Sequence, residues 1–462
     1  MTRFICCATL VLAAAWLPAG ARTVRQNQPQ PPAGATTYDE ARGVLDALRP
    51  DLLPEELRAL DAAERESAWP AWVVRRDEEI RERLDRGDED SVVMLLLFGA
   101  TFTTQPRYSF AAWASDRPPQ GRAEDIVVAA PAVRRRISDL AAAIAAPGAN
   151  ERLQFAREVI ERHGITPSTT PGRQAAEQFL LGALQRTLAD YDEYFREPSV
   201  GATLFRRRGL VSDTSVPAAF AIDRALADLA GRKRLAVDGV LRIAIVGPGL
   251  DFADKQEGLD VYPIQTIQPF AVVDGLRRLG AKDVRVVTYD VNPRVTRHVD
   301  AAIGAARAGR AYLLHLPRDE AQRWSPELVA YWQQLGGRIG KPTAGVASPS
   351  GVGAVAMRAV NIDPAIVQTL APHDLNVVLQ RPALAADERF DVVIATNVLI
   401  YYDVFEQSLA FANIAAMLRP AGLLLTNTPL FELPSIPMRL VGETPVAYTD
   451  AGRDWIMWYE RE

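Results

Sequence analysis

The stretch Leu-Arg-Ile-Ala-Ile-Val-Gly-Pro-Gly-Leu-Asp, from Leu241 to Asp251, decides the fold of this chain. Its first six residues form a largely apolar, β-branched run that ends in glycines. Such a run is typical of a buried parallel strand that enters a tight turn. Gly247 and Gly249 carry no Cβ, so the backbone of this turn can approach a ligand closely. We therefore predict a strand over residues 241–246 followed by a ligand-binding turn.

A second predicted strand, residues 284–289, ends on Asp290. A carboxylate at the tip of the second strand of a nucleotide-binding sheet can accept hydrogen bonds from both ribose hydroxyls. The alternative is an aspartate of a surface turn, because Asn292 and Pro293 follow directly.

The segment after Asp251 argues against a dinucleotide. A Gly-x-Gly-x-x-Gly turn would enter its helix almost at once and place a pyrophosphate on the helix N-terminus. Here a third glycine is missing at that spacing, a polar loop spans residues 252–263, and the predicted helix, residues 264–279, begins late. The loop either closes over a ligand or is a surface excursion.

The chain before the first predicted strand is helical. Residues 37–200 show apolar stripes at helical spacing, and a convincing alternating strand pattern is missing before about residue 235. We assign these stripes to a helical core. The predicted helices include residues 70–84, 90–98, 130–144, 151–162 and 173–195.

The first residues predict an export signal. Arg3 precedes an apolar segment, residues 4–17, which is too short to span a bilayer, and Ala19-Gly20-Ala21 is a small-residue cleavage site. Cleavage after Ala21 would remove both cysteines and leave a mature chain without disulfides. The alternatives are an uncleaved anchor or a misplaced start codon. A periplasmic or extracellular location is expected, and a cytoplasmic one if the signal is false.

Composition excludes some functions. The net charge is −5, and the basic triplets, residues 134–136 and 206–208, are isolated from each other. Neither feature favours nucleic acid or an anionic membrane as a partner. The apolar run at residues 92–98 is far too short to cross a membrane. The four histidines are scattered without metal-ligand spacing, so no metal is predicted, and neither a phosphate loop nor a Gly-x-Ser-x-Gly elbow is present.

The remaining chain, residues 201–462, predicts an α/β domain. Strands are expected at residues 374–380, 390–394 and 423–427, and the closing strands, 444–448 and 454–459, have a hairpin signature. An insertion at about residues 310–372 interrupts the domain, with strands predicted at 312–316 and 354–362. It is either a substrate-side element or purely structural. The domain order is a signal peptide (1–21), a linker (22–36), a helical domain (37–200) and the α/β domain.

From about residue 237 onward the chain resembles the class I S-adenosylmethionine-dependent methyltransferases. The glycine turn with Asp290 is similar to the first two cofactor motifs of that family, and Phe390-Asp-Val-Val-Ile-Ala-Thr-Asn397 is similar to its fourth. Leu418-Arg-Pro-Ala-Gly-Leu resembles the turn before the fifth strand. The resemblance implies a Rossmann-like sheet that ends in an antiparallel hairpin.

One segment is similar to a particular branch of that family. Asn397-Val-Leu-Ile-Tyr-Tyr402 resembles part of the chemotaxis-receptor methyltransferases, with Thr396 where those enzymes usually have arginine. Only the reaction class is carried over, because the N-terminal region shows no receptor-docking element.

The resemblance also implies roles for individual residues. Gly247 and Gly249 would lie against the methionine end of S-adenosylmethionine (SAM), with Asp251 just beyond, and Asp290 would hold the ribose. Asn397 and Tyr401 are the expected catalytic residues, with helix-start packing as the alternative for Tyr401 and Tyr402. The expected cofactor contacts are Gly247, Gly249, Asp251, Asp290, Gln380 (to adenine, where the family commonly has an acid) and Thr396.

The resulting hypothesis is SAM-dependent methyl transfer to an unidentified oxygen or nitrogen acceptor. The alternative is a non-catalytic, exported binding protein that keeps the fold, since SAM is made in the cytoplasm and the signal predicts export. A nucleotide oxidoreductase is disfavoured by the missing third glycine.

Overall fold

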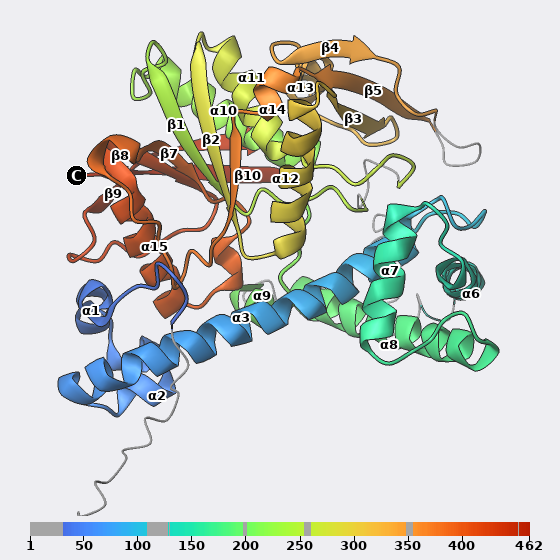
Figure 1. Cartoon of the computed structure of the whole chain (residues 1–462), viewed down its shortest axis with the longest axis horizontal. Helices are drawn as coiled ribbons and strands as arrows, with labels where there is room; N and C mark the ends of the chain where they lie inside the picture. Colours follow the sequence, from blue (N-terminus) through green and yellow to red (C-terminus); the bar gives the residue numbers. More distant parts are fainter. Residues whose placement is uncertain are drawn as a thin grey trace, which may run out of the picture.

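The computed structural model describes residues 31–108, 128, 130–196, 201–253, 260–347, 354–450 and 452–462. The predicted signal peptide and most of the predicted linker lie outside this range. Figure 1 shows a central sheet with a small second sheet beside it, and one long helix that runs past the central sheet to a group of helices. In the described part of the chain, no helix is both long and apolar enough to cross a membrane.

The central sheet has seven strands in the order β6-β2-β1-β7-β8-β10-β9. Pairing is parallel from β6 to β8, whereas β10 pairs antiparallel with both β8 and β9. This confirms the predicted α/β sheet with a C-terminal antiparallel hairpin. The strands are β1 (Val240–Val246), β2 (Asp283–Asp290), β6 (Leu370–Asp374), β7 (Phe390–Ile394), β8 (Leu418–Thr426), β9 (Met438–Ala447) and β10 (Arg453–Arg461).

Strand β1 sits between two layers of side chains. Ile243 and Ile245 belong to the core beneath α10 (Val216–Gly231) and α11 (Gln268–Arg278). Ala244 and Val246 belong to the core on the opposite face, beneath α15 (Val404–Met417). Because alternate residues of a strand point to opposite faces, a strand covered on both sides must be apolar throughout, as β1 nearly is.

N-terminal helices complete the α15 face. In the described chain no α-helix lies between β6 and β7 or between β8 and β9, and α1 (Tyr38–Ala47) with the first half of α3 (Ala62–Phe98) packs there instead. Trp69 Nε1 donates to the Thr36 carbonyl at 2.8 Å, and the Thr36 hydroxyl pairs with Asn413 of α15 at 2.9 Å. The N-terminal region is therefore part of the layer that covers the sheet.

Helix α3 is one continuous helix of 37 residues, so the predicted break between residues 84 and 90 is wrong. Asp61 and Glu64 form a capping box that starts it earlier than Pro70. Its polar middle stays helical because neighbouring helices supply ion pairs, such as Arg162 with Asp88 at 2.6 Å.

The second half of α3 belongs to a separate helical core. The apolar run Val92–Phe98 packs into this core together with α6, α7 and α8 (Figure 1). These helices are α6 (Pro131–Ala145), α7 (Glu151–Arg162) and α8 (Thr170–Arg196), close to their predicted bounds.

The insertion forms its own antiparallel sheet in the order β3-β5-β4. Both strands predicted in the insertion are present: β5 (Val355–Ile362) pairs along the whole of β3 (Tyr312–Asp319), and α13 (Pro326–Gln334) lies between them in sequence. Strand β4 (Gly340–Thr343), for which no strand was predicted, pairs antiparallel with β5. Helix α12 (Pro293–Arg307) separates β2 from the insertion in sequence.

The third strand of the main sheet is shifted from its predicted place. Residues 375–380 form a turn, because Asn376 accepts hydrogen bonds from Val378, Leu379 and Gln380. The actual strand is β6, which ends just before this turn. Strand β6 contains Pro372, and it lies at the edge of the sheet, where proline is tolerated. The short elements are η1 (Pro50–Leu52), α2 (Glu55–Arg58), α9 (Gly201–Arg207), α14 (Pro364–Val367), η3 (Ala386–Glu388) and η4 (Leu399–Tyr401).

Candidate functional site

A pocket of about 80 Å³ lies at the carboxyl ends of β1, β2 and β7. The chain moves outward from β1 through β2 to β6, and then returns to β7 on the other side of β1. Ligands of open α/β sheets bind at such a reversal, because the connections on either side diverge and leave a crevice. The pocket brings together six of the predicted site residues: Gly247, Gly249, Asp290, Thr396, Asn397 and Tyr401.

The glycine turn is left-handed at both glycines, with φ of +65° at Gly247 and +67° at Gly249. A Cβ at Gly247 would lie 2.5 Å from Cγ2 of Val398, and one at Gly249 would lie 2.6 Å from the Ser212 carbonyl oxygen. The space beside each glycine, where a side chain would start, is therefore occupied by other protein atoms in this structure.

Asp290 is buried at the tip of β2. Its Oδ1 accepts a hydrogen bond from the Asn292 backbone N–H at 2.8 Å, and the Gly249 backbone N–H also faces the carboxylate. Burial raises the pKa of Asp290 to about 7, although these two hydrogen bonds act in the opposite direction. A desolvated carboxylate of this kind gains most from additional hydrogen-bond donors.

Asp251 does not line the pocket. Its Oδ2 accepts a hydrogen bond from Gln265 Nε2 at 2.9 Å, and the same nitrogen reaches the His315 carbonyl of β3 at 2.8 Å. The carboxylate thus ties the loop after β1 to the insertion, which gives the insertion a bracing role there.

Gln380 also lies outside the pocket, and both ends of its side chain are occupied. Its Oε1 accepts a hydrogen bond from the Asn376 backbone at 2.9 Å, and its Nε2 donates to the Ala33 carbonyl at 2.9 Å. The acid that ends the third strand, β6, is Asp374. It was not predicted as a site residue because the strand was expected at residues 374–380, which put Asp374 at its start. Its carboxylate pairs with Arg81 of α3 at 2.7 Å.

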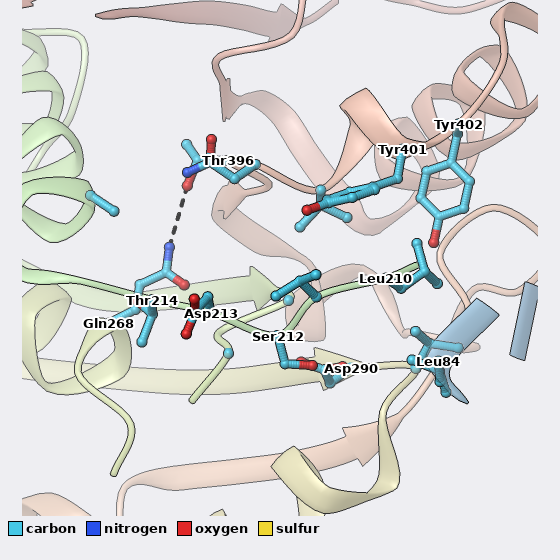
Figure 2. A pocket seen from close by; sticks show the side chains of 17 residues that line it. Leu84, Leu210, Ser212, Asp213, Thr214, Gln268, Asp290, Thr396, Tyr401 and Tyr402 are labelled. Carbon is cyan, nitrogen blue, oxygen red and sulfur yellow. Dashed lines mark hydrogen bonds between the residues drawn. The ribbon is translucent and has the colours of Figure 1, made fainter. Parts of the chain in front are cut away.

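At the end of β7, Thr396 is buried and faces Gln268 at the start of α11. Figure 2 shows the hydrogen bond between Gln268 Nε2 and the Thr396 hydroxyl, which measures 3.4 Å. The next residue, Asn397, is exposed and has a positive φ of 59°. Polar groups therefore gather at this end of the pocket.

Tyr402 lines the opposite end of the pocket, and Tyr401 lies between Tyr402 and Thr396, nearer the centre (Figure 2). Tyr401 directs its ring into the pocket, whereas the Tyr402 hydroxyl points toward Leu210 (Figure 2). Burial raises the pKa of Tyr402 well above its usual range. The Tyr401 carbonyl accepts a hydrogen bond from Arg83 of α3 at 2.9 Å, so α3 holds this end in place.

The pocket is covered by residues that the sequence analysis missed. The crossing segment, residues 210–214, runs from α9 to α10 over the glycine turn, and Leu84 of α3 lies beside it. The Leu250 N–H donates to the Ser212 carbonyl at 2.6 Å, and Asn292 Nδ2 donates to the Ser212 hydroxyl at 2.8 Å. In sequence, residues 212–215 carry only the signal of a polar helix cap.

A larger cavity of about 390 Å³ lies on the other side of the crossing segment, between α3, α7 and α12. Leu210 and Ser212 line both spaces. The cavity carries acidic groups on the α3 and α7 side and basic groups on α12, and one pair, Arg294 with Glu158, meets at 3.0 Å.

No protein-family model matches this chain, and no curated protein matches it in sequence. Solved structures similar to it include the N-methyltransferase NodS from Bradyrhizobium japonicum WM9, which is 14% identical with a TM-score of 0.26, over 52% of this chain and 96% of NodS.

Two other similar structures are methyltransferases. Magnesium protoporphyrin IX methyltransferase (ChlM) from Synechocystis PCC 6803, solved with bound SAM, is 14% identical with a TM-score of 0.25, over 58% of this chain and 94% of ChlM. The mitomycin 7-O-methyltransferase MmcR is 12% identical with a TM-score of 0.26, over 87% of this chain and all, 100%, of MmcR.

Proposed function

We propose that this protein binds SAM in the pocket at the carboxyl ends of β1, β2 and β7 and transfers its methyl group to an oxygen or nitrogen acceptor. The observation that carries the proposal is the buried Asp290 carboxylate, which lies beside a glycine turn at the point where the strand order reverses. A ribose diol supplies the two donors that such a carboxylate lacks.

The chemical character of the pocket changes along its length in the order of the cofactor's parts. One end is apolar and aromatic, the centre holds Asp290, and the other end is polar (Figure 2). An adenine ring fits the apolar end, the ribose fits the centre beside Asp290, and the amino-acid part fits the polar end. The apolar end comprises Leu84, Leu210 and Tyr402, and the polar end Asp213, Thr214, Gln268 and Thr396 (Figure 2).

This assignment replaces Gln380 as the adenine contact with residues of the apolar end. It also adds Asp213, whose carboxylate suits the ammonium group of the cofactor. Together with the ionised form of Asp290, it gives the pocket a negative character, which favours the cationic sulfonium.

The pocket must widen to hold the cofactor. Small-molecule sites commonly measure about 300–1,000 Å³, whereas this pocket measures about 80 Å³. Leu210 and Ser212 of the crossing segment also line the larger cavity, so the segment has space on that side to shift into when SAM binds.

The chemistry asks little of the protein beyond alignment. The acceptor's lone pair attacks the methyl carbon, the carbon–sulfur bond breaks, and S-adenosylhomocysteine leaves as a neutral thioether. The acceptor proton passes to solvent. Positioning of this kind is worth about 7–11 kcal/mol. Tyr401, whose ring enters the pocket, is the residue that we propose to orient the sulfonium or the acceptor, because an aromatic face attracts a cation.

Binding is tested by calorimetry with SAM, S-adenosylhomocysteine and NAD. We expect both SAM and S-adenosylhomocysteine to bind, and Asp290→Ala to weaken their binding about tenfold or more through the loss of charged hydrogen bonds. Asp283→Ala, at the exposed start of the same strand, is the matched control and should change nothing. Equal affinity of the Asp290 variant, or tight binding of NAD, contradicts the proposal.

A turnover assay distinguishes an enzyme from a non-catalytic binding protein. The narrow pocket is compatible with both. Methyl-labelled SAM is incubated with a panel of hydroxyl, amine and carboxylate acceptors. Tyr401→Phe should lower kcat more than SAM affinity if this residue positions the reactants. Cofactor binding without transfer to any acceptor would favour the binding protein.

Export is a separate proposal, and it rests on the sequence of residues 1–21 alone. N-terminal sequencing of the protein from its native cells should return Arg22 as the first residue. A soluble cytoplasmic protein that begins with Met1 would contradict export and leave the pocket assignment untouched.

A further inference from the structure

A chain of polar side chains connects the pocket to the C-terminal hairpin. Asn397 follows β7, Asn427 follows β8, and Asp454 lies at the start of β10. Asn427 Nδ2 donates to Asn397 Oδ1 at 2.7 Å and to Asp454 Oδ2 at 3.3 Å. Asn427 Oδ1 accepts the backbone N–H of Asn397 at 2.8 Å.

These bonds fix which way each amide faces. A backbone N–H can only donate, so the Asn427 atom that meets the Asn397 N–H must be the oxygen. The other end of Asn427 is then its NH₂ group, which suits the Asp454 carboxylate. This NH₂ group also meets Asn397, so the Asn397 atom on that side must be its oxygen. The Asn397 NH₂ group is consequently turned away from Asn427.

The backbone of Asn397 is held in an uncommon conformation. Its φ of 59° lies in the left-handed region, which asparagine tolerates better than most residues. Residues held in such conformations concentrate at functional sites. Asn397 is exposed and lines the pocket next to Thr396, at the polar end.

We propose that Asn427 and Asp454 are positioning residues that present the Asn397 NH₂ group to the carboxylate of bound SAM. This inference rests on the proposed function and adds the recognition of the cofactor's amino-acid part. Asn397 meets the carboxylate and Asp213 meets the ammonium group, so the polar end of the pocket is complementary to an amino-acid zwitterion. An amide with its oxygen outward would repel that carboxylate.

The test compares three ligands by calorimetry. S-adenosylhomocysteine carries both amino-acid charges, its decarboxylated analogue keeps only the ammonium group, and 5′-methylthioadenosine lacks both. The first variant is Asn397→Asp, which keeps the shape and places a carboxylate oxygen where the NH₂ group was. Only S-adenosylhomocysteine should bind more weakly, by about tenfold or more. Binding of 5′-methylthioadenosine should stay within about twofold, and the decarboxylated analogue should bind at least as tightly as before, because its ammonium group is attracted by the new carboxylate.

The second variant is the double exchange Asn427→Asp with Asp454→Asn. It preserves net charge and the hydrogen bond between residues 427 and 454, but it places an acceptor opposite Asn397 Oδ1. Asn397 must then turn its NH₂ group toward residue 427 and its oxygen toward the pocket. The same selective loss of S-adenosylhomocysteine binding is expected, with the melting temperature unchanged within a few degrees.

The outcomes are distinguishable. Equal weakening of all three ligands would show a merely structural role and overturn the positioning proposal. Weakening of the decarboxylated analogue as strong as that of S-adenosylhomocysteine would overturn the assignment to the carboxylate. If 5′-methylthioadenosine and S-adenosylhomocysteine both fail to bind the unaltered protein, the proposed function itself fails.

Discussion

The two walls of the pocket are built in different ways. The strand wall consists of the ends of β1, β2 and β7, with Gly247, Asp290 and Thr396 as its polar and turn residues. The cover consists of Leu84 of α3 and the crossing segment, residues 210–214. The strand wall is fixed by the sheet itself, because adjacent parallel strands bring their ends together. The cover is fixed only by contacts between segments far apart in sequence.

The main contact of the cover is between two glycines. Gly87 of α3 and Gly209, just before the crossing segment, meet so closely that a Cβ at Gly87 would lie 2.0 Å from the Leu210 carbonyl oxygen. The backbone there also forms a hydrogen bond, from the Leu210 N–H to the Arg83 carbonyl at 3.0 Å. The cover therefore depends on a backbone-to-backbone approach, which only glycine allows.

The largest predicted effect follows from this approach. Gly87→Ala should destabilise the fold by about 3 kcal/mol or more, because a methyl group cannot fit against a carbonyl oxygen at that distance. Chemical denaturation followed by circular dichroism measures the change. Cofactor binding should fall with it, since the crossing segment would lose its anchor on α3 and no longer form an ordered cover.

Gly182 provides the matched control for this prediction. It also lies in a long helix, α8, but a Cβ there would meet nothing within 4 Å. Gly182→Ala should be neutral or stabilising by up to about 1 kcal/mol, as alanine favours a helix. If both variants destabilise the protein equally, the glycine contact does not hold the cover.

Arg83 provides the second-largest effect. Its guanidinium donates to the Phe205 carbonyl of α9 at 3.1 Å and to the Tyr401 carbonyl of η4 at 2.9 Å, so one side chain joins the chain that leads into the cover to the chain that follows β7 of the strand wall. Burial lowers the pKa of Arg83, which marks a guanidinium held away from water. Arg83→Met should cost about 2–3 kcal/mol, because it leaves these carbonyls without their donor.

Its control is Arg75, on the same helix but largely exposed, with an ion pair to Glu56 at 3.4 Å. Arg75→Met should stay within about 0.5 kcal/mol. A loss at position 83 no greater than that at position 75 would show that Arg83 does not tie the two walls together.

The contrast between the walls also explains what the sequence could predict. The strand wall was predictable because each element, such as the apolar run before Gly247 or Asp290 before a proline-started helix, is encoded within about ten residues. The cover was not, since Gly87 and Gly209 carry no local signal that they will meet. The third strand was predicted too late, at residues 374–380, because the run at residues 377–379 is as apolar as a strand, while the actual strand, with Pro372, is not.

Asp290 gives the third prediction, which tests the strand wall through pH. Its pKa of about 7 in the folded protein lies above the usual value of 3.8. The folded state therefore holds this proton more tightly than the unfolded chain, and stability falls as pH rises between about 4 and 7. From pH 5 to pH 8 we expect a loss of about 2–3 kcal/mol.

Denaturation of the unaltered protein and of Asp290→Asn across this pH range measures the effect. The amide cannot ionise, so its stability should lack this part of the pH dependence. SAM affinity should instead rise with pH through about 7 in the unaltered protein, since the ionised carboxylate is the better acceptor for the ribose. If stability depends on pH in the same way in both proteins, Asp290 has an ordinary pKa and is in contact with water, not buried in the strand wall.

The smallest effect distinguishes the pocket from the core behind it. Gln380 connects the turn after β6 to the Ala33 carbonyl through hydrogen bonds of 2.9 Å at each end. Gln380→Leu removes both bonds, keeps most of the volume and should cost about 1–2 kcal/mol of stability. SAM affinity should not change, because the side chain does not line the pocket. Weaker SAM binding together with unchanged stability would instead return Gln380 to the adenine role that the sequence suggested. In that case the assignment of adenine to the apolar end, with Leu84 and Tyr402, would be wrong.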